Sequence, residues 1–264
     1  MFQENCLVVV IDSKKRKYIF ELKKDGVFHY HKGQIKHNDI IGKNQGCIVY
    51  SSQNEKLLVL KPTLTDYILF KLKRAGQIIY PKDIGQILVL GDIFSGAKVF
   101  ECGTGSGALT LFLLRAVGES GIVISCDIRQ DMLEVAKKNI ENYYKKPTEE
   151  IKNLKLLNLD FKQQIPEENN FDRAIIDIPD PWEILENLYK ILAPSGLAVF
   201  WLPTVLQVFK LVDTVEESFS SKFILEDIYE TIQREWQKKQ QSLRPKDRMV
   251  AHTGFLIIFR KLSL

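Results

Sequence analysis

The chain has 264 residues, of which 45% are hydrophobic and 27% are charged. A chain of this length forms one large domain, or a large domain with a small companion, at roughly 150 residues per domain. The composition is typical of a globular protein and excludes a disordered, collagen-like or coiled-coil chain.

The net charge is only +4, but it is distributed unevenly along the chain. Residues 1–65 carry 11 Lys and Arg against 6 Asp and Glu, residues 66–230 carry 18 against 25, and residues 231–264 carry 8 against 2. Basic ends around an acidic middle would let a polyanion bind at the ends while the middle performs another task. Solvated lysine faces are the commoner explanation of such runs, so both interpretations stay open.

The cysteines and the N-terminus indicate a cytoplasmic protein. No CxxC pair and no zinc-like His spacing occurs among Cys6, Cys47, Cys102 and Cys126, so we expect no metal. Acidic Glu4 and Asp12 flank a short apolar run, and we therefore expect neither a signal peptide nor a membrane span.

Residues 1–62 are expected to form a small β-rich domain. Polar, turn-like segments separate five short apolar runs: Cys6–Ile11, Tyr18–Leu22, Val27–Tyr30, Cys47–Tyr50 and Leu57–Leu60. Strands at this spacing predict a small antiparallel barrel or sandwich.

Residues 63–264 show alternating helix and strand signals. Residues 66–95 predict helical segments, with Pro81 in the first turn of one of them. The predicted strands are Lys98–Cys102, Ile122–Ile128, Leu154–Leu159, Ala174–Ile178 and Leu197–Leu202, and the predicted helices are Ser106–Val117, Gln130–Tyr144, Pro181–Leu192 and Thr204–Phe219. Apolar strands alternating with amphipathic helices predict an α/β fold with a doubly wound parallel sheet.

The C-terminal part breaks this alternation. Ile224–Trp236 and Gly254–Arg260 both predict strands, with a basic polar loop between them. Because no helix separates them, the two strands should form an antiparallel hairpin. This ending resembles that of the Rossmann-like S-adenosylmethionine-dependent methyltransferase fold.

The strongest local motif is the glycine turn Glu101–Gly107, which follows a predicted strand and opens a helix. At the carboxyl edge of such a sheet, glycines let the backbone approach a ligand closely. Gly103, Gly105 and Ala108 also match the dinucleotide fingerprint, in which a helix N-terminus binds pyrophosphate. A carboxylate at Glu101 would repel pyrophosphate but suits a ligand with a sulfonium and an ammonium group, which favours S-adenosylmethionine.

Three further acidic residues follow predicted strands. Asp127 ends the second strand of the series, where a carboxylate can accept hydrogen bonds from both hydroxyls of a ribose, in either cofactor. Asp160 either contacts the adenine amine of the cofactor or caps the end of its strand. Asp177 begins a loop stiffened by two prolines at the same edge as the glycine turn, where an active site is expected, although it could instead cap backbone amides.

Two other segments carry candidate residues. Tyr80 precedes Pro81, a place from which an aromatic ring could cover a cofactor, stack on an extruded base or pack in the core. Arg244, Arg248 and His252 lie on the loop that leads into the final strand, where basic groups could contact phosphates or remain solvated.

Several segments together resemble the tRNA (adenine-58) N1-methyltransferase family. They are QIIYPKD at Gln77–Asp83, ECGTGSGALT at Glu101–Thr110, DIR at Asp127–Arg129, DIPDPW at Asp177–Trp182, Pro203-Thr204, and RPKDRMVAHTGF at Arg244–Phe255. The glycine motif is shared by many methyltransferases, whereas the first, fourth and last segments are much more specific. The chain departs from the family pattern at Cys102, Asp127 and Leu159, where Ala or Val, Glu and Gly are more usual.

The resemblance implies a homotetramer that forms 1-methyladenosine in the T-loop of tRNA. It places S-adenosylmethionine at Glu101, Gly103, Thr104, Gly105, Ser106, Gly107, Asp127 and Asp160, and the target base at Asp177 and Tyr80. Methylation of the neighbouring adenine 57 stays open. A methyltransferase for a protein or small molecule remains an alternative, and so does a non-catalytic RNA-binding subunit, which the intact glycine turn together with Asp177 disfavours.

Overall fold

The structure is a computed structural model that describes residues 1–263. It divides into two compact units, Met1–Lys73 and the chain from Arg74 onward. Helix α1 (Leu64–Phe70) belongs to the first unit, although the sequence boundary was expected before it. Asp66 forms a capping box with Thr63 at the start of α1 and an ion pair of 2.5 Å with Lys17 of the first unit, which fastens the helix there.

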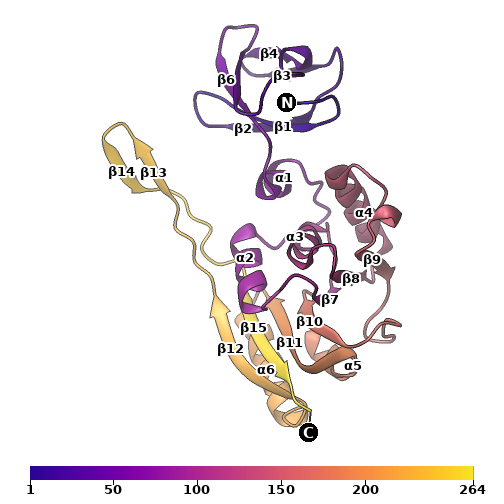
Figure 1. Ribbon diagram of the computed structural model, residues 1–264. Helices are drawn as coiled ribbons and strands as arrows, with labels where there is room; N and C mark the ends of the chain where they lie inside the picture. The colour runs from indigo at the N-terminus through magenta and orange to yellow at the C-terminus, as the bar shows by residue number, and fades with distance from the viewer. Residues whose placement is uncertain (264) are drawn as a thin grey trace. The chain divides into compact units, whose positions relative to one another are not determined.

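The N-terminal unit contains two antiparallel sheets around one core (Figure 1). Strands β1 (Leu7–Ile11), β2 (Lys17–Glu21), β5 (Cys47–Tyr50) and β6 (Lys56–Leu60) form one sheet in the order β2-β1-β6-β5. Strands β3 (Val27–Tyr30) and β4 (Gly33–Lys36) form a separate hairpin. The sequence analysis missed β4 because Gly33, with a positive φ of 97°, looked like part of a turn and in fact begins the returning strand.

The second unit is built on a seven-stranded sheet in the order β12-β15-β11-β10-β7-β8-β9 (Figure 1). The strands are β7 (Lys98–Cys102), β8 (Ile122–Asp127), β9 (Leu154–Asn158), β10 (Phe171–Ile176), β11 (Leu192–Leu202), β12 (Phe223–Glu230) and β15 (Phe255–Lys261). Strands β7 to β11 pair in parallel, and β15 runs antiparallel to both β11 and β12. The predicted doubly wound sheet with an antiparallel C-terminal hairpin is therefore confirmed.

Helices connect and cover the strands of this sheet. They are α2 (Pro81–Leu90), α3 (Ala108–Val117), α4 (Gln130–Tyr144), α5 (Leu185–Ile191) and α6 (Val205–Ser218), with short 3-10 turns at His37–Asp39, Thr148–Glu150 and Pro181–Ile184. The predicted helix at Pro181–Leu192 thus begins as a 3-10 turn. Between the covering helices the inner strands of the sheet are largely buried, with Phe100 of β7 and Phe200 of β11 completely enclosed, whereas the edge strands β9 and β12 are partly exposed. Burial on both faces explains why the inner strands are nearly continuous apolar runs.

The sheet order creates a crevice beside β7. The chain moves outward from β7 through β8 to β9 on one side, and then returns to β10 and β11 on the other. At such a reversal the loops leave the carboxyl ends of the strands in opposite directions, and ligands bind in the gap between them.

The segment between β12 and β15 differs from its prediction. The strand expected to reach Trp236 ends at Glu230, and the expected loop contains a two-stranded hairpin, β13 (Trp236–Lys239) and β14 (Ser242–Pro245). We call residues 231–253, which contain this hairpin, the arm. Polar and charged residues dominate β13 and β14, so their sequence lacks the apolar alternation of a buried strand.

Within residues 1–263 no helix is long and apolar enough to cross a membrane. The same part of the chain contains no group of three or more His, Cys, Asp or Glu side chains that could hold a metal ion.

Candidate active site

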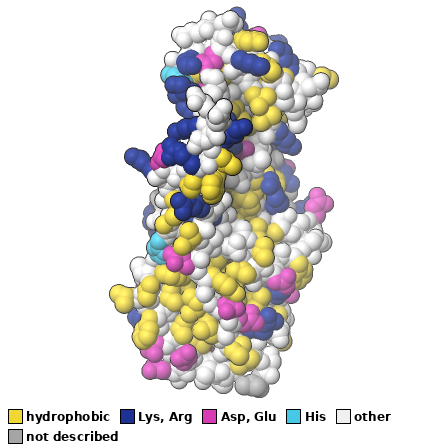
Figure 2. All heavy atoms as spheres, turned by 90° about the vertical axis from the view of Figure 1, so that its left-hand side faces the viewer, with side chains coloured by type: hydrophobic (Ala, Val, Ile, Leu, Met, Phe, Trp, Pro, Cys, Tyr) yellow, Lys and Arg dark blue, Asp and Glu magenta, His cyan; other side chains and the backbone are white. Residues whose placement is uncertain are grey.

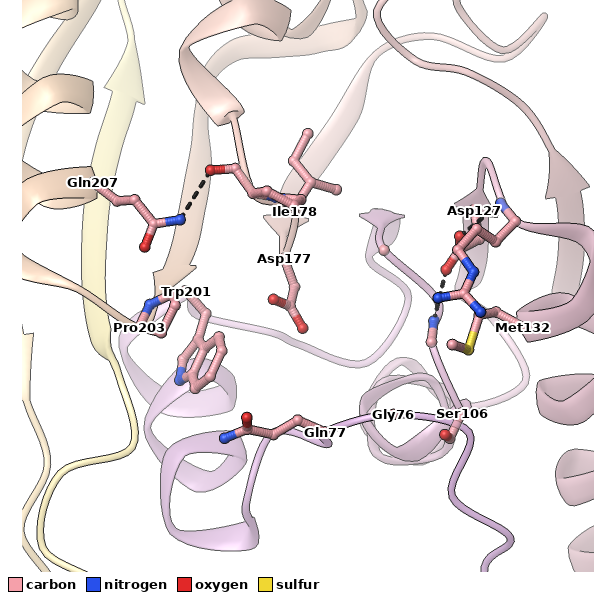
Figure 3. Close-up of a pocket in the computed structure, with 14 residues that line it drawn as sticks. Gly76, Gln77, Ser106, Asp127, Met132, Asp177, Ile178, Trp201, Pro203 and Gln207 are labelled. Carbon is pink, nitrogen blue, oxygen red and sulfur yellow. Dashed lines mark hydrogen bonds between the residues drawn. The ribbon is translucent and has the colours of Figure 1, made fainter.

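A pocket of about 420 Å³ opens beside the carboxyl ends of β7, β8 and β10 (Figure 3). Its lining comes from segments that are distant in sequence: Gly76 and Gln77 before α2, Gly103, Gly105 and Ser106 of the glycine turn, Asp127, Arg129 and Met132 after β8, Asp177, Ile178 and Pro179 after β10, and Trp201, Pro203 and Gln207 beyond them. The pocket therefore occupies the crevice that the sheet order creates.

Two glycines of the turn have different tasks. Gly103 has a φ of +100°, and a Cβ atom there would lie 2.1 Å from the backbone oxygen of Asp177, so no other residue fits. Gly105 also has a positive φ, but a Cβ atom would point into open space. Gly103 thus lets the turn pack against the Asp177 loop, and Gly105 leaves room for a ligand.

The other members of the turn support its shape. The hydroxyl groups of buried Thr104 and Ser125 lie 2.7 Å apart. Ser106 accepts hydrogen bonds from the backbone N–H of Ala75 and the side chain of Asn139. Of the predicted cofactor residues in this turn, Gly103, Gly105 and Ser106 line the pocket, whereas Thr104 and Gly107 lie outside its lining.

Glu101 lies beneath the turn and is almost completely buried, at 1% exposure. One carboxylate oxygen accepts a hydrogen bond of 2.6 Å from Thr110, and within residues 1–263 the other oxygen has no partner. Burial raises the pKa of Glu101 to about 7. The hydroxyl groups of Ser125 and Thr110 lower this pKa and offset only part of the effect of burial. Because Glu101 does not line the pocket, a cation bound there would favour its ionised form through electrostatic attraction across the turn and not through direct contact.

Asp127 ends β8 at the lip of the pocket. One of its oxygens accepts a hydrogen bond from the backbone N–H of Gly105 at 2.9 Å, and the other accepts one from Arg129 at 3.0 Å. These bonds fix the carboxylate, and each oxygen can still accept a second bond. The geometry therefore suits the paired hydroxyls of a ribose.

Asp177 follows β10 directly, and its backbone N–H donates to Cys102 at 2.8 Å. Figure 3 shows its carboxyl group pointing into the cavity, with Trp201 and Gln77 facing the same space. Burial, with a smaller contribution from the charge of Asp127, raises the pKa of Asp177 to about 7. The group is therefore poised to interact with a positive charge or a hydrogen-bond donor that enters the pocket.

Besides Thr104 and Gly107, three predicted residues lie outside the pocket lining: Glu101, Asp160 and Tyr80. The side chain of Asp160 accepts a bond of 3.0 Å from the backbone N–H of Lys162, and its carbonyl closes the following turn, so in this structure it acts as a turn residue after β9. Tyr80 is the residue before the first turn of α2 and is half-buried. Gln77, three positions earlier, contributes to the lining instead.

The three predicted substrate-binding residues occupy the arm. Arg244 and Arg248 are exposed, and Arg244 pairs with Asp247. The ring nitrogens of His252 lie 2.8 Å from the carbonyl of Pro203 and 2.7 Å from the carboxylate of Glu230. The carbonyl of Pro203 makes the larger contribution and Glu230 the smaller one to a raised pKa of His252. The contact with Pro203 anchors the arm to the pocket wall.

Sequence reasoning missed several lining residues, among them Gln77, Trp201 and Gln207. Gln77 lies in a segment that the resemblance had singled out, whereas Trp201 looks like an ordinary core residue of a strand. The side chain of Gln207 donates to the carbonyl of Pro179 at 3.0 Å and braces the Asp177 loop. Only the sheet order brings these residues together, so no local pattern could have shown them.

From the raised pKa of Glu101, we predict that replacing this residue changes the free energy of unfolding by an amount that depends on pH. Because the folded-state pKa is raised from 4.5 to about 7, the stabilising contribution of the neutral form is complete below pH 4.5 and is lost as pH rises through 7. In the ligand-free protein, Glu101→Gln should therefore raise the free energy of unfolding at pH 8 by up to about 3 kcal/mol, with the gain shrinking toward pH 5. Thermal unfolding between pH 5 and pH 8 measures this.

The matched control is Glu119→Gln, which changes an exposed glutamate and should leave the stability curve unchanged. If Glu101→Gln and the parent protein had superimposable curves of stability against pH, ionisation of the buried Glu101 side chain would not destabilise the folded protein, which would contradict the prediction.

The residues present fit S-adenosylmethionine. The unpartnered oxygen of Glu101 and the carboxyl group of Asp177 favour a cationic ligand, Gly105 leaves the space for it, and Asp127 suits its ribose. A pyrophosphate would instead place negative charge beside these acids.

Comparisons with known proteins agree with this chemistry. The model of the tRNA methyltransferase complex GCD14 subunit family matches residues 57–254, and a TrmI-like N-terminal model matches residues 1–49. The chain is 36% identical to the tRNA (adenine(58)-N(1))-methyltransferase TrmI of Thermus thermophilus, over 95% of this chain and 94% of that protein. It is 32% identical to the tRNA (adenine(57)-N(1)/adenine(58)-N(1))-methyltransferase of Methanocaldococcus jannaschii, over 96% and 94%.

Solved structures show the same fold over the whole chain. The tRNA (m1A58) methyltransferase TrmI from Aquifex aeolicus matches with a TM-score of 0.85 and 32% identity, covering 100% of this chain and 99% of that one. A SAM-dependent O-methyltransferase from Thermotoga maritima matches with a TM-score of 0.90 and 29% identity, covering 100% and 95%. The cofactor is S-adenosyl-L-methionine, and the chain belongs to the tRNA (adenine-58) N1-methyltransferase family.

Proposed function

We propose that this protein transfers a methyl group from S-adenosylmethionine to N1 of adenine 58 in the T-loop of tRNA. The observation that carries the proposal is the Asp177 carboxyl group, which points into the pocket beside the glycine turn and has its pKa raised by burial. The names of relatives that cover almost the whole chain support the same substrate.

The chemistry requires alignment rather than a base. Adenine N1 has a lone pair and carries no hydrogen, so it can attack the methyl group in line without losing a proton. S-adenosylmethionine would supply that methyl group on a sulfonium, whose bond to the methyl carbon breaks as the new N–C bond forms, so that a neutral thioether leaves. The ring becomes positively charged as the bond forms, and a carboxylate that accepts a hydrogen bond from the N6 amine both orients the base and compensates that charge.

Asp177 is in the right place to be this carboxylate. With a pKa of about 7 it is partly protonated in the empty pocket, and the positive charge of the cofactor would favour its ionised form. Asp127 and the glycine turn at Gly105 would hold the cofactor, with Glu101 acting on its charge from beneath the turn, and Trp201 and Gln77 would bound the space left for the base.

Replacing Asp177 should separate catalysis from cofactor binding. We expect Asp177→Ala to lower kcat for 1-methyladenosine formation by roughly 100-fold or more, by analogy with the loss of one preorganised electrostatic group, while cofactor affinity changes little. Single-turnover kinetics on a tRNA transcript, with calorimetry for the cofactor, would measure both.

The control is Asp180→Ala, which removes a partly exposed acid three positions along the same loop. Near-normal turnover of Asp177→Ala would rule out this role for Asp177.

In this proposal, basic side chains of the arm contact the RNA backbone. Six of its residues are basic and two are acidic: Arg234, Lys238, Lys239, Arg244, Lys246 and Arg248 against Glu235 and Asp247. We assign phosphate contacts to Arg244 and Arg248, which are exposed, and an anchoring role to His252. Because the T-loop encloses its adenine, the target base must be extruded before it reaches Asp177.

Removing the two arginines should change the salt dependence of binding. For Arg244→Ala with Arg248→Ala, we expect weaker tRNA binding and a slope of log affinity against log salt that is smaller by about 1 for each lost phosphate contact. Filter binding across a salt series measures the slope. Lys138→Ala on the exposed face of α4 is the control, and an unchanged slope in the double variant would exclude phosphate contacts by these arginines.

We also propose self-association into the homotetramer that the resemblance implies. Strand β12 is the edge of the seven-stranded sheet, and it exposes Ile224 and Ile228. Nearby α6 exposes Leu206 and Phe209, at 82% and 68%, and Figure 2 shows hydrophobic side chains gathered on this side of the protein. An apolar patch beside an open sheet edge suits a second copy of the same surface, and sedimentation as a monomer would refute this.

The relatives leave the choice of neighbouring adenine open, because one is named for adenine 57 as well as 58. We place the reaction in the cytoplasm, in keeping with a tRNA substrate and with four cysteines that form no disulfide in this structure.

A second candidate is methyl transfer to an oxygen of a small molecule or protein. A carboxyl group with a pKa of about 7 would also suit a general base for a hydroxyl acceptor, and one structural neighbour is titled an O-methyltransferase. Mass spectrometry of nucleosides from tRNA incubated with the protein distinguishes the two, since only the first yields 1-methyladenosine.

A further inference from the structure

A buried ion pair lies in the first turn of α2. The ammonium group of Lys82 and the carboxylate of Asp83 are 2.7 Å apart, and these side chains are 7% and 1% exposed. Lys82 also donates to the carbonyl of Thr231 at 2.7 Å and to the hydroxyl of Thr253 at 2.6 Å. That hydroxyl donates in turn to the second oxygen of Asp83 at 2.6 Å.

These bonds join the two ends of the arm. Thr231 is its first residue and Thr253 its last, and both are held by the same turn of α2. We call Lys82, Asp83, Thr231 and Thr253 the clamp. The chain just before this turn, at Gly76 and Gln77, lines the active-site pocket, so the clamp attaches the arm to a segment that carries two lining residues.

The residues on either side of Thr253 also fasten the returning strand to the pocket wall. His252 contacts the carbonyl of Pro203, a lining residue. Gly254 lies against Trp201, another lining residue, and a Cβ atom there would be 2.5 Å from the indole ring. Of three consecutive residues, His252 and Gly254 thus contact the pocket wall, and Thr253 binds the first turn of α2.

The choice of charged groups indicates a positional role. A buried ion pair contributes little more than an apolar contact of the same volume, because desolvation offsets the attraction, but its bonds are directional. In the described part of the chain, β13 and β14 pair only with each other. An isolated two-stranded hairpin has no packing to fix its direction, so the direction of the arm depends on its two ends.

We propose that Lys82 and Asp83 are positioning residues that set the arm relative to the pocket. Through Thr231 and Thr253 they hold the arm so that its basic side chains engage the RNA backbone while the target base reaches Asp177. This inference rests on the proposed function and extends it to residues that touch neither the cofactor nor the base.

Thr253→Val tests the clamp with the least disturbance, because it keeps the shape of the side chain and removes the hydroxyl that both clamp residues bind. We expect the KM for tRNA to rise roughly tenfold, as a lost buried hydrogen bond of about 1.4 kcal/mol would give. The kcat and the affinity for S-adenosylmethionine should stay within about twofold. Thr253→Ser keeps the hydroxyl and should restore the KM.

Two comparisons separate positioning from a general loss of structure. Thr214→Val removes a hydroxyl bond of 2.7 Å on α6 and should change nothing. In the Arg244→Ala, Arg248→Ala background, Thr253→Val should have a smaller effect on KM than in the parent protein, because two of the six basic groups that the clamp positions are absent.

The proposal is overturned if Thr253→Val leaves the KM unchanged, if its effect adds in full to that of the arginine variants, or if Thr253→Ser fails to restore it. Failure of the proposed function appears differently, as a parent protein that does not methylate tRNA. In that case amide hydrogen exchange across the arm decides: Thr253→Val must speed it and Thr253→Ser must not, and equal rates refute the clamp.

Discussion

Two carboxyl groups that have no compensating cation among residues 1–263, the buried Glu101 and the half-buried Asp177, are the constraint around which the second unit is organised. Glu101 and Asp177 belong to adjacent strands, since β7 and β10 pair side by side, and both have a pKa raised to about 7. Placing acids here opposes folding, and the surrounding sheet must supply the stability that keeps them in place. A cation in the pocket would remove this cost, so the arrangement selects for a positively charged ligand.

The remaining features hold these acids in position. Gly103 allows the glycine turn to touch the backbone of Asp177, and Gly105 orients Asp127 through its N–H. Gln207 braces the loop after Asp177 from α6. The clamp in turn holds the basic arm, because its hydrogen bonds attach the two ends of the arm to the first turn of α2, just after the segment that carries Gln77. In the proposed function, the acidic middle and the basic C-terminal part of the sequence act together, the first as a site for a cationic cofactor and the second as a surface for RNA.

Sequence patterns predicted those parts of the fold that depend on local burial. The strand Lys98–Cys102 and the helix Gln130–Tyr144 have the predicted bounds, because each carries a complete apolar pattern within its own length. Strand β4 and the hairpin β13–β14 were missed, since short polar strands are stabilised by pairing and lack that pattern. Helix α1 joins the first unit through the ion pair between Lys17 and Asp66, a contact that no local pattern reveals.

Some residues of the candidate site could be predicted from sequence patterns, and others could not. Glu101, Asp127 and Asp177 were identifiable because each ends or follows a strand at the binding edge of the sheet, a rule of the fold. Trp201 was not, because its role depends on which strand lies beside which. Asp160 and Tyr80 were proposed from their positions, after a predicted strand and before Pro81, as well as from the resemblance, and in the structure they lie outside the pocket lining.

The most direct measurement is the proton release that accompanies cofactor binding. Calorimetric titration of the protein with S-adenosylmethionine at pH 7, repeated in buffers of different ionisation enthalpy, reports the protons released per binding event. Because burial raises the pKa values of Glu101 and Asp177 to about 7, both acids are partly protonated in the ligand-free protein at pH 7, and a cationic ligand should release protons from them. A binding heat that does not depend on the buffer would contradict the account.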